Sequence, residues 1–234
     1  LRTTDAEGYR TTYSYDMLGR LVCRTHPDEG KTLMHYDLAG NLTGKQTANL
    51  GVTGDEIKYI YRAGRLTEIY YPQHSDNDVH FLYDPAGRIA RRHDGTGSEE
   101  FVYDHLGNVA QSVRRIVVPT ENQAYVFRTL FKYDSFGRIR NIIYPDGEVV
   151  HYGYTTGGLL KNVVGLKQRD NSVYLWNRVY DEQGRKIFQL AGNGVWTRYG
   201  YDPARQWLKE LHTELPSGEV LQDLHYRYDA AGNG

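Results

Sequence analysis

The stretch Tyr13–Val22, YSYDMLGRLV, decides the fold because it reads as a strand, a tight turn and a second strand. Asp16 stands at the first position of a type I turn, where its carboxylate can accept hydrogen bonds from backbone N–H groups two residues further on. Gly19 can take the left-handed conformation that closes such a hairpin with a bulge. The phrase Tyr-Asp-x-x-Gly-Arg-Leu therefore predicts a β-hairpin.

The same phrase returns along the chain, for example as FLYDPAGRIA, FVYDHLGNVA, FKYDSFGRIR and YRYDAAGNG. Its steps run from 20 to 30 residues and average about 24, which is typical of repeat architectures. The ten tyrosines of the phrase, hereafter the signature tyrosines, are Tyr15, Tyr36, Tyr61, Tyr83, Tyr103, Tyr133, Tyr154, Tyr180, Tyr201 and Tyr228.

Asp follows the signature tyrosine in eight copies, and Gly lies four residues after it in eight, including Gly232 in the last. Because the Asp recurs in nearly every unit, we interpret it as a turn-forming residue rather than a catalytic carboxylate. In the six most regular copies the predicted turn residues are Tyr15, Asp16 and Gly19; Tyr36, Asp37 and Gly40; Tyr83, Asp84 and Gly87; Tyr103, Asp104 and Gly107; Tyr133, Asp134 and Gly137; and Tyr180, Asp181 and Gly184.

Three copies depart from the pattern. In the looser YTTGGL, Thr155 stands where Asp is expected. YRAGRL is one residue short, so that Gly64 comes early, and YDPARQW has Arg205 where Gly is expected. One further stretch is ambiguous: LGVTGDEIKYIY, residues 50–61, could begin a short helix, but its β-branched and aromatic residues favour a strand.

An aromatic residue lies two positions before the signature tyrosine in eight of the ten copies, whereas the residue between them varies freely. Residues i and i+2 share one face of a strand, so each unit is predicted to present a paired aromatic face. Between the copies, phrases such as Pro-Asp-Gly and Asn-Gly predict a second turn that returns the chain. We therefore predict an all-β array of about ten antiparallel hairpins in a sheet strip, curved by its twist and its Gly bulges. A closed β-propeller is the rival, and the uneven steps favour the open strip.

The composition restricts the classes of function. The 234 residues, 39% hydrophobic, suffice for a sizeable core. A formal net charge of -1 argues against a nucleic-acid partner and against an anionic membrane surface. The one cysteine, Cys23, excludes an internal disulfide framework, and no apolar stretch has the length of a membrane span. We expect residues 1–234 to be one repeat segment, cut at both ends and without a separate core or toxin domain.

The phrase Tyr-Asp-x-x-Gly-Arg-Leu, repeated in register with Pro-Asp-Gly between copies, closely resembles the YD repeat of the Rhs family. Relatives include bacterial Rhs toxins, the B and C components of Tc toxins and animal teneurins. The resemblance implies a strip that spirals into a hollow shell around a C-terminal toxin domain, in a parent protein that is secreted or at the cell surface. It does not imply self-cleavage here, because the Asp-Pro pairs at Asp84 and Asp202 are ordinary repeat turns.

We therefore expect a structural wall segment whose partner is a polypeptide cargo, and no enzyme. No hydrolase, zinc or P-loop motif occurs, so no cofactor is expected. No metal site is expected either: the acidic loops HSDNDVH and DGTGSEE lack a recognised ligand spacing and are interpreted as solvated loops. The alternative is a carbohydrate-binding or adhesion module that stacks sugars on Trp176, Trp196 and Trp207, although packing on the sheet is favoured. An open strip also leaves edge strands that can pair with another copy.

Overall fold

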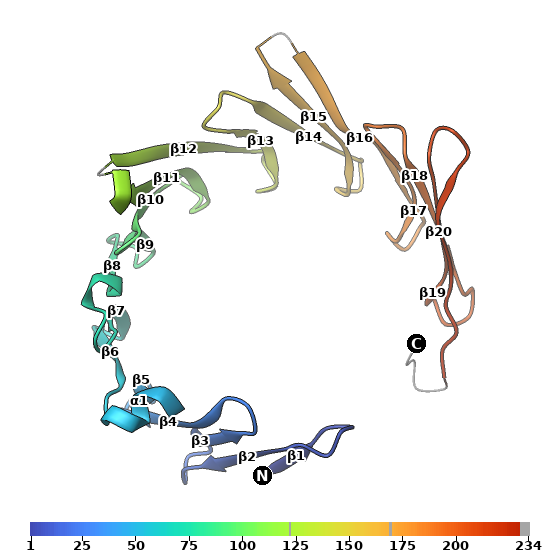
Figure 1. Ribbon diagram of the computed structural model, residues 1–234. Helices are drawn as coiled ribbons and strands as arrows, with labels where there is room; N and C mark the ends of the chain where they lie inside the picture. Colours follow the sequence, from blue (N-terminus) through green and yellow to red (C-terminus); the bar gives the residue numbers. More distant parts are fainter. Residues whose placement is uncertain (122, 169, 230–234) are drawn as a thin grey trace. The chain divides into compact units, whose positions relative to one another are not determined.

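The predicted all-β fold is confirmed by the structure, a computed structural model that describes residues 1–121, 123–168 and 170–229 (Figure 1). Its twenty strands belong to an antiparallel sheet, and a helix of one to two turns is the longest helical element among the described residues. The turn expected around Gly232 lies outside these residues. The chain divides into two compact units, unit 1 (Leu1–Val102 and Ser112–Phe127) and unit 2 (Tyr103–Gln111 and Arg128–Gly234).

Unit 1 is built from hairpins with two short helical insertions. Its elements are β1 (Arg2–Thr4), β2 (Arg10–Tyr15), β3 (Leu21–His26), β4 (Gly30–Tyr36), β5 (Leu42–Gln46), α1 (Ala48–Thr53), β6 (Ile57–Arg62), β7 (Arg65–Tyr70), η1 (Ser75–Asn77), β8 (Val79–Tyr83), β9 (Ile89–Asp94) and β10 (Gly97–Tyr103). The last residue of β10, Tyr103, belongs to unit 2. The strands β11 (Val109–Val118) and β12 (Gln123–Tyr133) also contribute residues to both units, and η2 (Pro119–Glu121) lies between them in the sequence.

Unit 2 continues the same hairpin pattern. Its further strands are β13 (Ile139–Ile143), β14 (Val149–Tyr154), β15 (Leu160–Lys167), β16 (Asp170–Tyr180), β17 (Lys186–Ala191), β18 (Trp196–Tyr201), β19 (Leu208–Glu214) and β20 (Val220–His225).

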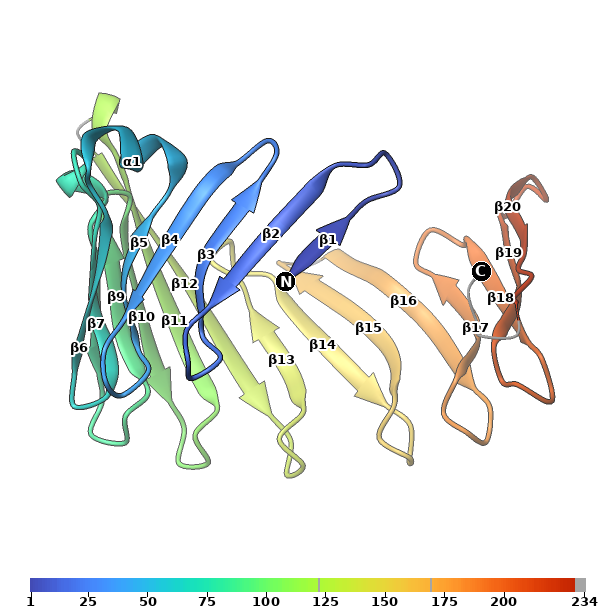
Figure 2. The same cartoon turned by 90° about the horizontal axis from the view of Figure 1, so that it is seen from below.

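Within each unit, strands that follow one another in sequence pair antiparallel (Figure 2). The turns of the signature join β2 to β3, β4 to β5 and so on, and the other turns join the hairpins to one another. Because the strand direction alternates, all signature turns of a unit lie at one end of its strands. The pairing register shifts at the signature tyrosine, for example between Ser14 and Tyr15, so the predicted bulge is present where the strand enters the turn.

Burial alternates along the strands as the period of two predicts. In β8, Phe81 and Tyr83 are half-buried, while Leu82 between them is 56% exposed. Val102, the corresponding residue of β10, is 52% exposed. The paired aromatic residues therefore share the more protected face of the sheet.

The expectation of a sizeable core is wrong. Among the described residues only three apolar side chains are buried, Ile142, Val150 and Leu175, and all of them lie in unit 2. In the part of each unit that the structure describes, no second sheet and no layer of helices covers either face of the strands (Figure 2). Because a sheet without a covering layer leaves both faces accessible, stability has to come from contacts between neighbouring hairpins.

The strand interpretation of residues 50–61 is wrong for its first part. α1 covers Ala48–Thr53, and β6 begins only at Ile57. Gly54 ends the helix in a left-handed conformation, with φ 79°, and its N–H donates to the carbonyl oxygen of Leu50. The C-terminal glycine therefore separates this short helix from the β-branched strand that follows.

Candidate functional site: the signature turns and their contacts

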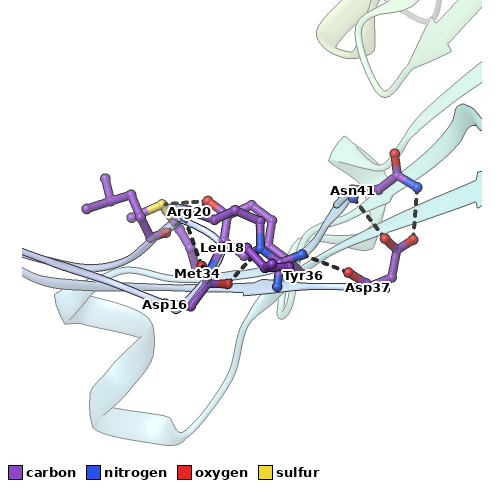
Figure 3. Close-up of polar contacts among 8 residues, drawn as sticks. Asp16, Leu18, Arg20, Met34, Tyr36, Asp37 and Asn41 are labelled. Carbon is purple, nitrogen blue, oxygen red and sulfur yellow. Dashed lines mark hydrogen bonds and ion pairs between the residues drawn. The ribbon is translucent and has the colours of Figure 1, made fainter. Parts of the chain in front are cut away.

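In the six regular copies, the signature turn is closed by its own aspartate. The Gly19 N–H donates to the carbonyl oxygen of Asp16 at 3.0 Å, as in a type I turn. Oδ1 of Asp16 accepts from the backbone N–H groups of Leu18 and Arg20, both at 2.9 Å (Figure 3). The glycine has φ 78°, which is strained for any residue with a Cβ. The carboxylate thus satisfies two backbone donors that the turn leaves without a backbone partner.

This geometry repeats with little variation. In the six regular copies the Gly N–H to Asp carbonyl distance is 2.9–3.1 Å, and the distance from the N–H four residues on to Asp Oδ1 is 2.8–3.0 Å. The six glycines have φ between 75° and 89°. They are Gly19, Gly40, Gly87, Gly107, Gly137 and Gly184. We propose that the Asp and Gly residues of the signature are structural, since their polar groups and backbone conformation are used within the turn.

In seven copies, the hydroxyl of the signature tyrosine ties its hairpin to the one before it. Tyr36 donates to the carbonyl oxygen of Leu21, the second residue after Gly19, at 2.9 Å. The same bond recurs at 2.6–3.0 Å in six further copies, with donors and acceptors Tyr83 and Leu66, Tyr133 and Val109, Tyr154 and Ile139, Tyr180 and Leu160, Tyr201 and Lys186, and Tyr228 and Leu208. We call this bond the tyrosine clasp.

The arginine after the signature glycine reinforces the clasp. Arg138 forms an ion pair with Asp134 of its own turn at 2.7 Å, and its guanidinium carbon lies 4.4 Å from the ring centre of Tyr154 in the next hairpin. Arg185 contacts Asp181 and the ring of Tyr201 in the same way. In the first copy, Arg20 also donates from Nη1 to the carbonyl oxygen of Asp37 at 2.9 Å. One guanidinium therefore joins two successive turns through charge, hydrogen bonding and stacking on an aromatic ring.

These hydrogen bonds favour the ionised carboxylates. The backbone N–H of Arg20 lowers the pKa of Asp16, and the Asn41 side chain has the same effect on the pKa of Asp37. The Arg138 side chain lowers the pKa of Asp134. Stabilisation of the charged form by hydrogen bonds and a nearby cation is the opposite of what a general acid at neutral pH requires.

The tyrosine clasp was not anticipated from the sequence, although the sequence carries a clue to it. The position two residues before the signature tyrosine accepts either ring, as Tyr13 and Phe81 illustrate, whereas the signature position is Tyr in all ten copies. Phe and Tyr fill nearly the same volume, so a strict preference for Tyr indicates that the hydroxyl has a partner.

Two of the irregular copies form turns of other lengths, whereas YTTGGL keeps the regular length, with the Gly158 N–H donating to the carbonyl oxygen of Thr155 at 2.9 Å. In YRAGRL, Ala63 and Gly64 have φ of 49° and 73°, which is the two-residue hairpin of type I′. In YDPARQW, Gln206 rather than Arg205 takes the left-handed conformation, with φ 66°. Its N–H donates to the carbonyl oxygen of Asp202, so this turn is one residue longer than the regular turns. Arg205 therefore does not stand in for the glycine.

The three tryptophans have different surroundings. Trp176 on β16 is 55% exposed. Trp196, at the start of β18, is half-buried between the rings of Phe188 and His212, at 6.3 Å and 5.3 Å. Trp207 packs against Tyr228, with ring centres 5.1 Å apart. Of the three residues considered for sugar stacking, Trp176 is the one whose ring faces solvent, and the other two pack on neighbouring hairpins.

The acidic loops show no chelating geometry. HSDNDVH contains η1, and DGTGSEE contains the turn between β9 and β10. Within residues 1–121, 123–168 and 170–229, no three His, Cys, Asp or Glu side chains are grouped as metal ligands. None of the helices in these ranges is long and apolar enough to cross a membrane.

The chain is similar in sequence to a known repeat family and to known toxin proteins. A family model described as RHS Repeat matches residues 1–32. Toxin subunit YenC2 of Yersinia entomophaga is 26% identical over 85% of this chain and 20% of its own length. Double-stranded DNA deaminase toxin A of Burkholderia cenocepacia is 24% identical over 99% of this chain and 18% of its own length. The chain therefore spans a fifth or less of the length of these two relatives.

A solved structure shares the fold. The crystal structure titled TcdB2-TccC3-Cdc42 superposes with a TM-score of 0.75 at 22% sequence identity, covering 99% of this chain and 14% of that one. At this level of identity the likeness establishes the hairpin array and nothing about activity.

Proposed function

The chain is an Rhs/YD-repeat segment, and from this premise we propose that it forms part of the wall of a shell that encloses or displays a polypeptide of its parent protein. The observation that supports the proposal most directly is the tyrosine clasp, which ties hairpin to hairpin, as between Tyr154 and Ile139, where a globular domain would use a packed core. We propose that residues 1–234 act as one such segment.

Such a wall works by exclusion. Neighbouring strands of a sheet lie about 4.8 Å apart and are joined by backbone hydrogen bonds. No extended polypeptide passes between strands at that spacing, so a protease on one side does not reach a chain on the other. The tyrosine clasps, together with contacts such as that of Arg138 with the ring of Tyr154, hold the hairpins together at their turn ends. A sheet of short strands would otherwise separate most easily there.

Exposed apolar side chains fit a wall that contacts other polypeptides. At the tips of the signature turns, Leu18 is 75% exposed, Leu38 105% and Phe136 81%. Large apolar residues exposed at corresponding places of successive repeats are typical of surfaces that meet another protein segment. We propose a polypeptide cargo as the partner, and a parent protein that is secreted or at the cell surface.

We propose no catalytic role for this segment. The recurrent carboxylates that most resemble catalytic groups, such as Asp16 and Asp134, are used in turn hydrogen bonds. The deaminase toxin is named for an activity of the whole protein, and this chain matches only 18% of that protein's length. In our proposal, any toxic activity belongs to the cargo and not to the repeats.

Limited proteolysis of the parent protein tests the wall. The domain downstream of the repeats should resist a protease at concentrations that degrade the same domain expressed alone. A matched variant carrying Tyr154→Phe and Tyr180→Phe should lower this resistance, while Tyr15→Phe should leave it unchanged. Equal cleavage of the enclosed and free domains would refute the shell.

A carbohydrate-binding module is the second candidate, and the exposure of Trp176 is the observation that favours it. Tyr174, two residues earlier on β16, is 50% exposed, and its hydroxyl donates to Glu148. Two neighbouring aromatic rings beside a carboxylate suit a pyranose ring. A glycan array separates the candidates: binding that Trp176→Ala abolishes and Trp196→Ala preserves would support a lectin-like role, and absence of binding supports the wall.

A further inference from the structure

Unit 1 contains a cavity of about 420 Å³ that belongs neither to the signature turns nor to the tyrosine clasps. It lies beside the insertions that carry α1 and η1. Its lining residues are Leu50, Ile57, Tyr71, Pro72, His74, Asn77, Val79, Asp94 and Thr96. The volume falls within the range of small-molecule sites, about 300–1,000 Å³.

The cavity is formed where the repeat is interrupted. Most hairpins return through a tight turn, but β5 and β6 are joined through α1, and β7 and β8 through the segment with η1. Gln73 Nε2 donates to Oδ2 of Asp55 at 2.8 Å and so ties the second insertion to the first. The backbone N–H of Tyr71 donates to Oδ1 of Asp78 at 2.8 Å, which closes the second insertion on itself. These bonds hold the walls of the cavity in place.

A close backbone contact between Gly95 and η1 positions the third side of the cavity. Gly95, in the turn between β9 and β10, lies so near η1 that a Cβ built on it would be 1.8 Å from the carbonyl oxygen of Asp76. Only glycine permits this approach, and it brings Asp94 and Thr96 to the cavity. Asp94 accepts from the backbone N–H of Thr96 at 2.9 Å, so its carboxylate is oriented.

The lining combines an apolar surface with a negative charge. Leu50, Ile57, Pro72 and Val79 supply aliphatic groups, and Tyr71 supplies a ring. Of the described residues that line the cavity, none is Lys or Arg, and Asp94 is the one carboxylate. The segments 47–57 and 71–79 around the cavity add four more acidic residues and no Lys or Arg, in a chain whose total charge is only -1. Arg92 and Arg114 lie close enough to Asp94 to interact with its charge, but the five carboxylates in and around the cavity outnumber these two guanidinium groups. An apolar cavity with this excess of negative charge is complementary to a cation with an apolar body.

We propose that this cavity binds an organic cation, with the apolar body of the ligand against Leu50 and Val79 and its cationic group at Asp94. An amine or guanidinium group would donate to the carboxylate, as in charge-assisted hydrogen bonds. Two sources share this chemistry, a free amphipathic amine and the side chain of Arg or Lys beside an apolar residue in a polypeptide. Such a cation site would function whether or not the chain belongs to a shell.

Methyl NMR titration of the chain tests the proposal with benzamidine as the probe. Benzamide, which has the same ring without the charge, and benzoate, which carries the opposite charge, are the matched ligands. We expect benzamidine to shift the methyl resonances of Leu50 and Val79, and to bind at least tenfold more tightly than benzamide. Raising the salt concentration from 0.05 to 0.5 M, on the order of a threefold shorter screening length, should weaken benzamidine binding alone.

Two variants provide the controls. Asp94→Asn keeps the acceptor oxygen for Thr96 and removes the charge, so it should weaken benzamidine binding about threefold to tenfold and leave benzamide unchanged. Asp28→Asn removes an equivalent charge from an exposed turn of the same unit, where the Asp28 side chain is 88% exposed, and should change neither. Equal affinities for benzamidine and benzamide, or methyl shifts elsewhere in the chain, would overturn the proposal.

A peptide distinguishes the two sources of the cation. If acetyl-Leu-Arg-amide binds at least tenfold more tightly than benzamidine with the same methyl shifts, the natural ligand is a polypeptide segment. If it binds more weakly while benzamidine binds as expected, the ligand is a free amine. Binding of neither probe at millimolar concentration would refute the assignment of the cavity as a cation site.

Discussion

The tyrosine clasp can be tested by removing one oxygen atom. Tyr180→Phe deletes the hydroxyl that donates to the Leu160 carbonyl oxygen at 2.8 Å and keeps the ring in place. This copy isolates the hydrogen bond, because Leu159 rather than Arg follows the preceding signature glycine, Gly158. A half-buried hydrogen bond between neutral groups contributes about 1 kcal/mol, with a spread of roughly 0.5 kcal/mol either way. In a chain of 234 residues, that loss corresponds to a fall in Tm of about 2–4 °C.

Thermal unfolding followed by circular dichroism measures the shift, and Tyr15→Phe is the matched control. Tyr15 is the first signature tyrosine, is 47% exposed, and finds no hydrogen-bond partner for its hydroxyl among the described residues. Its replacement should move Tm by less than about 1 °C, as for a neutral surface change. Equal shifts for Tyr15→Phe and Tyr180→Phe would show that the hydroxyl bond contributes nothing, and the clasp would then be an incidental contact.

Three further outcomes follow from the geometry. Arg138→Gln removes an ion pair and a stacking contact, so it should lower the unfolding free energy measured by urea titration by about 1–2 kcal/mol. The control Arg140→Gln, on the exposed side of β13, should lower it by less than about 0.5 kcal/mol. Gly192→Ala would place a Cβ 1.4 Å from the Val173 carbonyl oxygen and should lower the unfolding free energy by roughly 3 kcal/mol or more. In Gly19→Ala the new Cβ meets open space, so only the strain of the positive φ should lower the unfolding free energy, by about 1 kcal/mol. Similar urea midpoints for the two variants would contradict this order. Because the signature carboxyls have a lower pKa in the folded chain than in the unfolded chain, protonation favours unfolding, so the urea midpoint should fall as the pH drops below about 4. A midpoint that stays constant down to pH 2 would contradict this linkage.

The hairpin array could be predicted from the sequence because its information is local. Asp16 and Gly19 determine a turn through groups within four residues of each other, and such short-range chemistry repeats in recognisable letters. The alternation of faces was equally accessible, since Phe81, Leu82 and Tyr83 differ in burial as period two requires.

The clasp and the cavity depend on contacts that are remote in sequence. Tyr36 reaches Leu21, fifteen residues away, and which carbonyl it meets is determined by the register between hairpins. The cavity needs α1, η1 and the close approach of Gly95 together, and none of these has a repeat-like motif. The predicted core failed for a related reason: apolar content does not reveal whether a sheet receives a second layer.

Amide hydrogen exchange on a Tyr154→Phe/Tyr180→Phe double variant tests most directly whether neighbouring hairpins support one another through their clasps. The expected result is faster exchange in β13–β16, whose hairpins those two hydroxyls join, with β19 and β20 exchanging as before. Unchanged exchange in β13–β16, or an equal loss of protection along every strand of unit 2, would contradict the account.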